Sequence, residues 1–262
     1  MKMLLTRRMM LASLGAAASL SAVAPRIRAG CLVAPGDFDG LLVSLREMQG
    51  LGYSGFSTTM RVMRTGRLDE MRGQLSEFAM DLVGVRSTLP KYVDLGLDRA
   101  LEEVSRLAMA ARQFGSRTLV LHSTGLAADG KFKPQDLEVK AKFFDLAAKR
   151  CKDTGVIFTY RTQEAEFAGE AAEINGLIAK TDKNITYYHL DLARAARVYP
   201  EAIGVFRDNP SRTFSMEAPF GDAAFKIHDL AAAIKHTKWI SWLIESTPTE
   251  VSRGSMKKIF GI

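Results

Sequence analysis

Seven short apolar runs of the chain end on residues that could bind a ligand, move a proton or hold a metal ion. The residues at these ends are Ser57-Thr58, Arg86-Ser87, His122-Ser123, Arg161-Thr162-Gln163, His189-Leu190-Asp191, Glu217 and Glu245. A helix-like stretch of a dozen or more residues comes before each run. Because parallel strands wrapped by helices place their functional groups at their carboxyl ends, we expect these polar residues to meet in one bowl.

The elements that must position these residues alternate regularly along the chain. Period-2 and buried apolar runs predict strands at 31–34, 53–57, 82–86, 118–122, 156–162, 185–190, 212–217 and 239–245. Helical spacing predicts helices at 38–49, 68–80, 97–114, 134–152, 168–180, 199–206 and 223–236. This alternation indicates parallel pairing through crossover helices. Eight strands close a barrel, so the predicted fold class is α/β, a (β/α)8 TIM barrel in a single domain.

The amino-terminal segment is predicted to be an export signal covering residues 1–29, which leaves 30–262 for the barrel. A basic start is followed by a run of apolar and small residues from Met9 to Ala24, and the hexapeptide from Thr6 to Leu11 resembles the bacterial twin-arginine signal. Cleavage after Ala24 or after residue 29 is equally compatible with this pattern. The run is too short and too rich in alanine for a permanent membrane span. We therefore expect export to the periplasm or cell envelope of a bacterium.

The charge and the cysteines exclude two classes of function. The formal net charge is +7, but five positive charges and no negative one precede Gly30, at Lys2, Arg7, Arg8, Arg26 and Arg28. The body is therefore nearly neutral, and nucleic acid is not an expected partner. Cys31 and Cys151 have no metal-ligand spacing. They could pair in an oxidising compartment, but Cys151 lies in a helical pattern and is expected to be a small buried hydrophobe.

Four fragments together resemble the xylose isomerase-like barrel family that contains sugar phosphate isomerases and epimerases. They are Gly52-Tyr53-Ser54-Gly55-Phe56, Gly155-Val156-Ile157-Phe158-Thr159-Tyr160 followed by Glu166-Phe167, Leu190-Asp191, and Trp242-Leu243-Ile244-Glu245. Their order and spacing carry the resemblance, which spans nearly the whole body. It implies a barrel whose strand ends hold a divalent metal through carboxylates and a histidine. It also implies acid or base residues that move a proton beside a sugar carbonyl.

The chain departs from the family's pattern at several strand ends. Ser57 stands where many relatives have a glutamate, Arg86 where many have a histidine, and Tyr160-Arg161-Thr162-Gln163 where Tyr-His-Asn-His is common. Glu217 lies at the approximate place of another histidine. A guanidinium cannot ligate a cation, but it can hold a carboxylate or phosphate through two parallel hydrogen bonds. The two arginines therefore predict either an anionic group on the substrate or an internal clamp that fills the site.

Oxygen-bearing residues at the later strand ends predict a metal site. Three carboxylates that converge repel one another unless a cation or an arginine offsets them, and oxygen ligands favour Mg or Mn over Zn. The expected ligands are Asp191, Glu217 and Glu245, with Gln163 as a neutral oxygen. The alternative is that these acids pair with Arg86, Arg161 or Arg194 and that no metal is bound.

Three residues are the candidates for catalysis, and three for substrate binding. The catalytic set is His122, Glu217 and Arg161, and the substrate-binding set is Arg86, Arg161 and His189. A histidine titrates near neutral pH, so His122 at a strand end could transfer a proton. His189 lies two residues before Asp191, one layer deeper on the same strand face, where it could also be a hydrogen-bonded core histidine.

Two functions remain open from these residues. One is a divergent sugar phosphate isomerase or epimerase, in which a divalent metal polarises a carbonyl of a small sugar or polyol while His122 or a carboxylate carries the proton. The other is a non-catalytic barrel, a pseudoenzyme, that binds a small polar or anionic ligand in the cell envelope, because a fold alone does not fix an activity.

Overall fold

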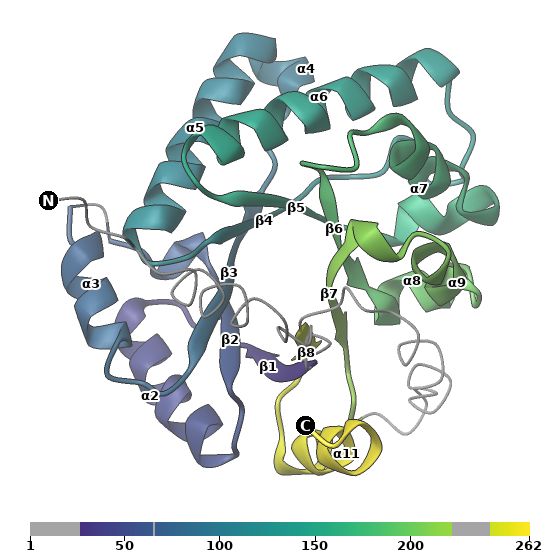
Figure 1. The fold of residues 1–262 in the computed structure, drawn as a ribbon. Coiled ribbons are helices and arrows are strands. Elements are labelled where there is room, and N and C mark those ends of the chain that lie inside the picture. The colour runs from purple at the N-terminus through teal and green to yellow at the C-terminus, as the bar shows by residue number, and fades with distance from the viewer. Residues whose placement is uncertain (1–26, 65, 222–241) are drawn as a thin grey trace, which may run out of the picture.

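Eight parallel strands close into a barrel in the computed structural model, which describes residues 27–64, 66–221 and 242–262. Each strand pairs with its neighbours in sequence, and β8 pairs with β1 to complete the ring (Figure 1). The strands are β1 (Arg28–Leu32), β2 (Gly55–Thr59), β3 (Asp81–Thr88), β4 (Thr118–His122), β5 (Ile157–Arg161), β6 (Tyr187–Asp191), β7 (Thr213–Ala218) and β8 (Trp242–Glu245). The predicted (β/α)8 TIM barrel is confirmed.

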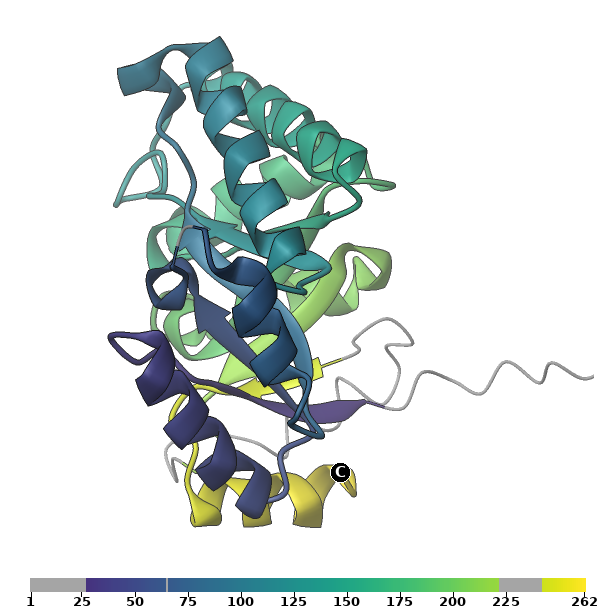
Figure 2. The ribbon, with the colours of Figure 1, turned by 90° about the vertical axis from the view of Figure 1, so that its left-hand side faces the viewer.

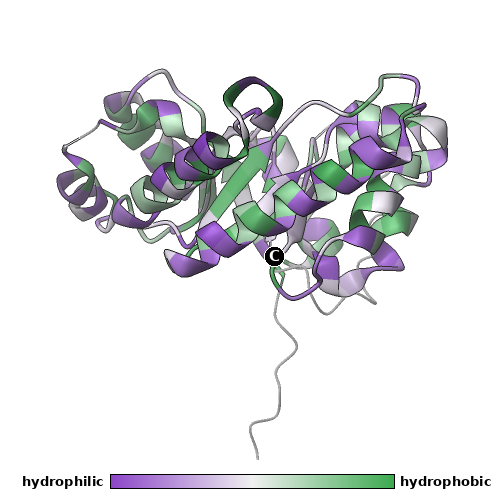
Figure 3. Ribbon diagram, turned by 90° about the horizontal axis from the view of Figure 1, so that it is seen from above, coloured by the Kyte–Doolittle hydropathy of each residue, from purple (hydrophilic) through white to green (hydrophobic). Residues whose placement is uncertain are grey.

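Helices surround the barrel and bury their apolar faces against it (Figure 2). They are α2 (Phe38–Gly50), η1 (Met60–Val62), α3 (Leu68–Leu75), α4 (Tyr92–Leu95), α5 (Leu97–Gln113), α6 (Pro134–Asp153), η2 (Glu164–Phe167), α7 (Ala168–Lys180), α8 (Leu192–Val198), α9 (Ala202–Arg207), η3 (Pro210–Arg212) and α11 (Glu250–Phe260). Hydrophobic and hydrophilic residues alternate along these helices (Figure 3), as expected for elements with one buried face. None of the described helices combines the length and apolarity that crossing a membrane requires.

The structure corrects several element boundaries. β1 begins at Arg28, three residues before the predicted start at Cys31, so it extends into the predicted signal segment. The single predicted helix 199–206 is replaced by α8 and α9, which are separated around Pro200, where proline cannot continue a helix. α3 ends at Leu75 rather than at residue 80. The predicted helix 223–236 and the first residues of the last predicted strand lie outside the described residues.

The interior of the barrel has an apolar side. Trp242 and Ile244 of β8 pack with Val83 and Leu32 in a cluster separate from the main core. Gly55 makes room for this cluster, because a Cβ added there would come within 2.5 Å of the Trp242 ring. A side chain at position 55 would therefore force the Trp242 ring to shift.

The two cysteines are small buried core residues. Both are free and buried among the described residues. Burial raises the pKa of each thiol to about 12, with the Glu245 carboxylate adding to the effect at Cys31. Neither thiol is a reactive nucleophile in this state, since the thiolate is the reactive form.

The position of β1 limits where an export signal can be removed. Arg28 pairs with Trp242 and stacks on its ring at 3.9 Å, and the Ala29 carbonyl accepts a hydrogen bond from the Ser54 amide at 3.1 Å. Cleavage after Ala29 would delete both contacts. We therefore propose that the signal ends before Arg28.

A chain beginning at Gly30 should be less stable than one beginning at Pro25 by roughly 2 kcal/mol, because strand pairing and the arginine–tryptophan contact are lost. Urea unfolding of the two chains measures this difference. Mass spectrometry of the mature protein from a bacterial periplasm tests the position of the cut. A mature chain that starts at Gly30 with undiminished stability would contradict the proposal.

Candidate functional site

Four charged side chains from four different strands form one ion-pair network at the carboxyl end of the barrel. Arg86 Nη1 lies 2.7 Å from Glu217 Oε2, and Arg161 Nε lies 3.2 Å from the same oxygen. Arg161 Nη2 lies 2.5 Å from Asp191 Oδ2. The residues come from β3, β5, β6 and β7, which closure of the sheet brings to one axis. We call Arg86, Arg161, Asp191 and Glu217 the arginine–carboxylate network.

His189 lies within the barrel beneath this network. Its Nε2 is 3.1 Å from Glu217 Oε2, and its Nδ1 is 2.6 Å from Ser215 Oγ. Burial lowers the pKa of His189 to about 4, although the Glu217 carboxylate opposes this effect. The ring is therefore neutral at pH 7 and only 2% exposed. These contacts are typical of a hydrogen-bonded core histidine that orients Glu217. Direct contact between His189 and a substrate stays a prediction.

The two carboxylates of the network have pKa values that move in opposite directions. Burial alone would raise the pKa of Glu217, but Arg86, His189 and Arg161 outweigh it and hold the pKa well below its ordinary value. Burial and the negative charge of Glu217 raise the pKa of Asp191 despite the opposing Arg161. Glu217 is consequently a fixed negative charge, which does not suit it as a general base.

The prediction that Glu245 joins Asp191 and Glu217 in one cavity is wrong. In the barrel register Glu217 pairs with Ile244, whereas Glu245 pairs with Ala218 and Cys31. Because successive side chains of a strand point to opposite faces, Glu245 points away from the barrel axis, toward the helices. Its carboxylate accepts hydrogen bonds from the backbone amides of Phe220 and Thr247, each at 2.8 Å. Glu245 lies in the predicted strand, but its side chain is on the opposite face of the sheet from the predicted one.

Gln163 also has a role other than the one predicted. Its Nε2 donates to the Thr162 carbonyl at 3.0 Å, and its Oε1 accepts from Arg194 Nη1 at 3.1 Å. Arg194 in turn lies 3.3 Å from Asp191 Oδ2 through its Nε. Gln163 therefore extends the network toward solvent.

The residues at this end of the barrel do not fit a divalent metal ion. One oxygen of each carboxylate, Asp191 Oδ2 and Glu217 Oε2, lies within hydrogen-bonding distance of at least one guanidinium. A cation there would meet the positive charges of Arg86 and Arg161, which cannot act as ligands. Within 27–64, 66–221 and 242–262, no group of three or more His, Cys, Asp or Glu residues is arranged to hold a metal. The arrangement corresponds to the internal clamp that the sequence left open.

A cavity of about 370 Å³ opens beside the network. It is lined by residues at or just after the ends of β3, β4 and β5, together with Arg194: Thr88, Leu89, Lys91, His122, Ser123, Thr124, Gly125, Gln163, Glu164, Ala165 and Arg194. Its volume falls in the range of small-molecule sites. His122 is the titratable group on its wall that could exchange a proton near pH 7. Burial, followed by the positive charges of Arg161, Arg86 and Arg194, lowers the pKa of His122 and keeps it neutral at pH 7.

The walls of this cavity are held by a buried charge cluster that the sequence reading missed. Lys140 of α6 lies 2.9 Å from Glu166 Oε1 and 2.6 Å from Glu173 Oε1, and all three are buried. Glu166 accepts from the Gln163 amide and Glu173 from the Leu126 amide, so the cluster ties both loops to the helices. Lys140 falls on the apolar stripe of α6, where a lysine needs a buried partner. A lysine at an apolar position of this helical pattern is therefore the sequence feature that could have indicated the buried charge cluster.

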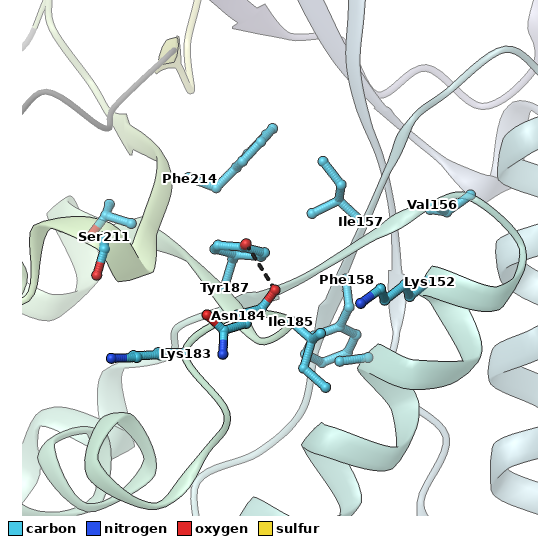
Figure 4. A pocket seen from close by; sticks show the side chains of 12 residues that line it. Lys152, Val156, Ile157, Phe158, Lys183, Asn184, Ile185, Tyr187, Ser211 and Phe214 are labelled. Carbon is cyan, nitrogen blue, oxygen red and sulfur yellow. Dashed lines mark hydrogen bonds between the residues drawn. The ribbon is translucent and has the colours of Figure 1, made fainter.

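A second cavity, of about 580 Å³, lies at the opposite end of the barrel (Figure 4). It is bordered by the first residues of three strands, Ile157 of β5, Tyr187 of β6 and Thr213 of β7, and its lining is mostly apolar. Tyr187 donates a hydrogen bond to the Asn184 carbonyl at its edge. The predicted site residues Arg86, His122, Arg161, His189, Asp191 and Glu217 do not line it. Residues at this end of a TIM barrel ordinarily serve stability.

Solved structures with the same fold include several sugar-metabolising enzymes. A sugar phosphate isomerase/epimerase from Parabacteroides distasonis matches with a TM-score of 0.69 and 12% identity, covering 90% of this chain and 94% of that one. The 3-keto-D-glucoside 4-epimerase from E. coli matches with a TM-score of 0.68 and 11% identity, covering 90% and 100%. A xylose isomerase-like TIM barrel protein from Mycobacterium smegmatis, in complex with magnesium, gives 0.66 and 14%, covering 93% and 98%.

These matches define the class of the fold. The chain has the xylose isomerase-like TIM barrel fold, as the resemblance of its fragments implied. No family model matches the sequence, and no curated protein sequence matches it. At 11–14% identity the likeness establishes the fold alone, so the activity has to be argued from the site.

Glu245 supplies a test that depends on pH. Burial raises its pKa to about 7, against which the hydrogen bonds from Thr247 and Phe220 act. The folded state therefore holds the proton more tightly than the unfolded chain, whose carboxyl has a pKa of 4.5. Its contribution to stability is complete below pH 4.5 and is lost as the pH rises to 7.

We expect the Glu245→Gln variant to remove this loss. Relative to the variant, the wild-type free energy of unfolding should fall by roughly 1–3 kcal/mol between pH 4.5 and 7.5. Urea titrations at several pH values measure both slopes, with the exposed Glu250→Gln as the matched control. Parallel slopes for the wild type and Glu245→Gln would show that this carboxyl titrates normally.

Proposed function

We propose that this barrel binds a small sugar- or polyol-like molecule in the cavity beside the arginine–carboxylate network, without a divalent metal ion in that network. The observation that carries the proposal is the clamp itself, in which Arg86 and Arg161 hold the carboxylates that would otherwise be free to bind a metal. The carboxyl ends of the strands are where ligands of this fold class bind.

The lining of the cavity suits hydroxyl groups. Thr88 and Ser123 offer hydroxyl groups that can donate and accept, and Arg194 offers a charged donor. Sugar hydroxyls both donate and accept, so a mixed lining can pair each of them. The names of the structurally similar proteins, which include sugar isomerases and epimerases, agree with a ligand of this class.

The first test is metal content together with ligand binding. We expect the purified mature chain to carry no stoichiometric Mg, Mn or Zn, to keep its melting temperature in a chelator, and to bind glucitol in calorimetry. Glu217→Gln should lower stability by about 3 kcal/mol or more, because two buried guanidiniums lose their shared partner. Asp208→Asn, in an exposed pair, is the matched control and should change stability little.

Two outcomes would contradict the proposal. Stoichiometric metal that disappears in Glu217→Gln would show that the carboxylates leave the arginines to bind a cation. Failure of glucitol and related polyols to bind would show that the cavity does not take a sugar- or polyol-like ligand.

Proton transfer next to a carbonyl is a second candidate function, and His122 is the observation that favours it. His122 lies on the cavity wall, and its lowered pKa makes it a neutral acceptor at pH 7. In an isomerisation or epimerisation it would take the proton from the carbon next to the carbonyl, while Arg161, held by Asp191, would stabilise the negative charge that develops on oxygen.

Deuterium exchange separates this enzyme from a non-catalytic barrel. In deuterated water the wild-type chain should exchange the proton next to the carbonyl of a bound ketose, and His122→Gln should bind the ketose without exchange. The Asp208→Asn variant, which changes an exposed residue outside the cavity, should retain the exchange. Ketose binding without exchange in the wild type would support the pseudoenzyme instead.

A further inference from the structure

The guanidinium of Arg86 has one nitrogen without a partner. Its Nε donates to Ser57 Oγ at 3.1 Å, and its Nη1 pairs with Glu217 at 2.7 Å. Its Nη2 is buried and meets no hydrogen-bond acceptor among the described residues. Arg86 is only 7% exposed, so solvent does not satisfy this group either. A buried, charged N–H group without an acceptor is costly, and it indicates an acceptor that arrives from outside the chain.

The neighbours of Arg86 hold it in this position. The Ser57 hydroxyl that accepts from Nε donates its own proton to the Gly84 carbonyl at 3.0 Å, so its role is fixed. The oxygen of Glu217 that meets Nη1 is shared with Arg161 and His189. Rotation of the guanidinium would break these contacts without offering Nη2 an acceptor.

The charges on the barrel side of the sheet leave a positive surplus. The guanidiniums of Arg86 and Arg161, together with that of the half-exposed Arg194 on α8, contact the two carboxylates of Asp191 and Glu217. His122 and His189 are neutral at pH 7 because burial lowers the pKa of each. At the rim of the cavity, the charges of Lys91 and Glu164 offset each other. Among these described residues, the arginine–carboxylate network and Arg194 together carry three positive and two negative charges.

The cavity lies next to this surplus. Thr88, which lines it, follows Arg86 by two residues on β3 and shares its strand face, so Arg86 lies about 6–7 Å below the cavity wall. The positive charges of Arg161, Arg86 and Arg194 all act on His122, which is itself on that wall. Arg86 does not itself line the cavity, so a ligand that enters beside Thr88 and His122 would have to reach past them to contact the unpaired nitrogen.

We propose that the ligand is a polyhydroxylated carboxylic acid whose carboxylate accepts a hydrogen bond from Arg86 Nη2. This inference rests on the proposed sugar- or polyol-like ligand and adds an acidic group to it. A single carboxylate neutralises the one surplus charge, whereas a phosphate dianion would leave a negative charge uncompensated beside Asp191 and Glu217. The remaining hydroxyls of the acid pair with the polar lining of the cavity.

Calorimetry with three matched probes tests the inference. The probes are gluconate, which carries one carboxylate, glucitol, its neutral counterpart, and glucose 6-phosphate, a dianion. We expect the wild-type chain to bind gluconate at least about tenfold more tightly than either of the others, as charge-assisted hydrogen bonds allow. Arg86→Lys keeps the positive charge but lacks Nη2. It should bind gluconate no more tightly than glucitol.

The controls separate this inference from the proposed function. Arg46→Lys, an exposed substitution outside the cavity, should leave all three affinities unchanged. Equal binding of gluconate and glucitol to the wild type would overturn the carboxylate and leave the polyol proposal standing. Tighter binding of glucose 6-phosphate would overturn the assignment of a single charge. If none of the three binds, the proposed function itself fails.

A second measurement does not depend on the variant folding. Nuclear magnetic resonance of the wild-type chain with nitrogen-labelled arginine follows the guanidinium groups directly. Adding gluconate should shift and sharpen the Arg86 side-chain resonances, and adding glucitol should leave them in place. Unchanged Arg86 resonances at saturating gluconate would contradict the contact.

Discussion

The structure of the functional end of this barrel depends on the ion pairs between Arg86, Arg161 and the carboxylates of Asp191 and Glu217. Each of these charges is expensive to bury alone, and each is tolerated because the opposite charge lies within hydrogen-bonding distance. His189 completes the arrangement by contacting Glu217 from below. Closure of the sheet makes this possible, since the four charged residues come from four different strands.

The same ion pairs change what the fold can do. A xylose isomerase-like barrel with free carboxylates at these positions could hold a metal, whereas here the guanidiniums already occupy them. In this chain Asp191 and Glu217 pair with guanidiniums, and Arg86 Nη2 has no acceptor among the described residues. The chemistry expected of the site then shifts from metal-assisted polarisation to hydrogen bonding and charge neutralisation by the protein's own groups.

Outside the barrel, a second set of charges supports the cavity. Lys140 joins two loops through Glu166 and Glu173, which hold the amides of Gln163 and Leu126. The loops that form the cavity walls are therefore held by buried ion pairs on the helix side of the sheet, while the ion pairs of the arginine–carboxylate network lie on the barrel side. Polar groups of this kind can specify one arrangement only when all members are paired. The free nitrogen of Arg86 is an exception that calls for a ligand.

The sequence by itself determined the fold and the strand ends. Alternating apolar runs and helical stretches require crossovers, and the carboxyl ends of parallel strands meet at one edge, so Arg86, Arg161, Asp191 and Glu217 could be placed together in advance. The tertiary structure alone decided the facing of Glu245, because a shift of one residue moves a strand's side chain to the opposite side of the sheet. It also decided that the acids pair with arginines. Distances between side chains on different strands are set by closure and packing, which no local pattern encodes.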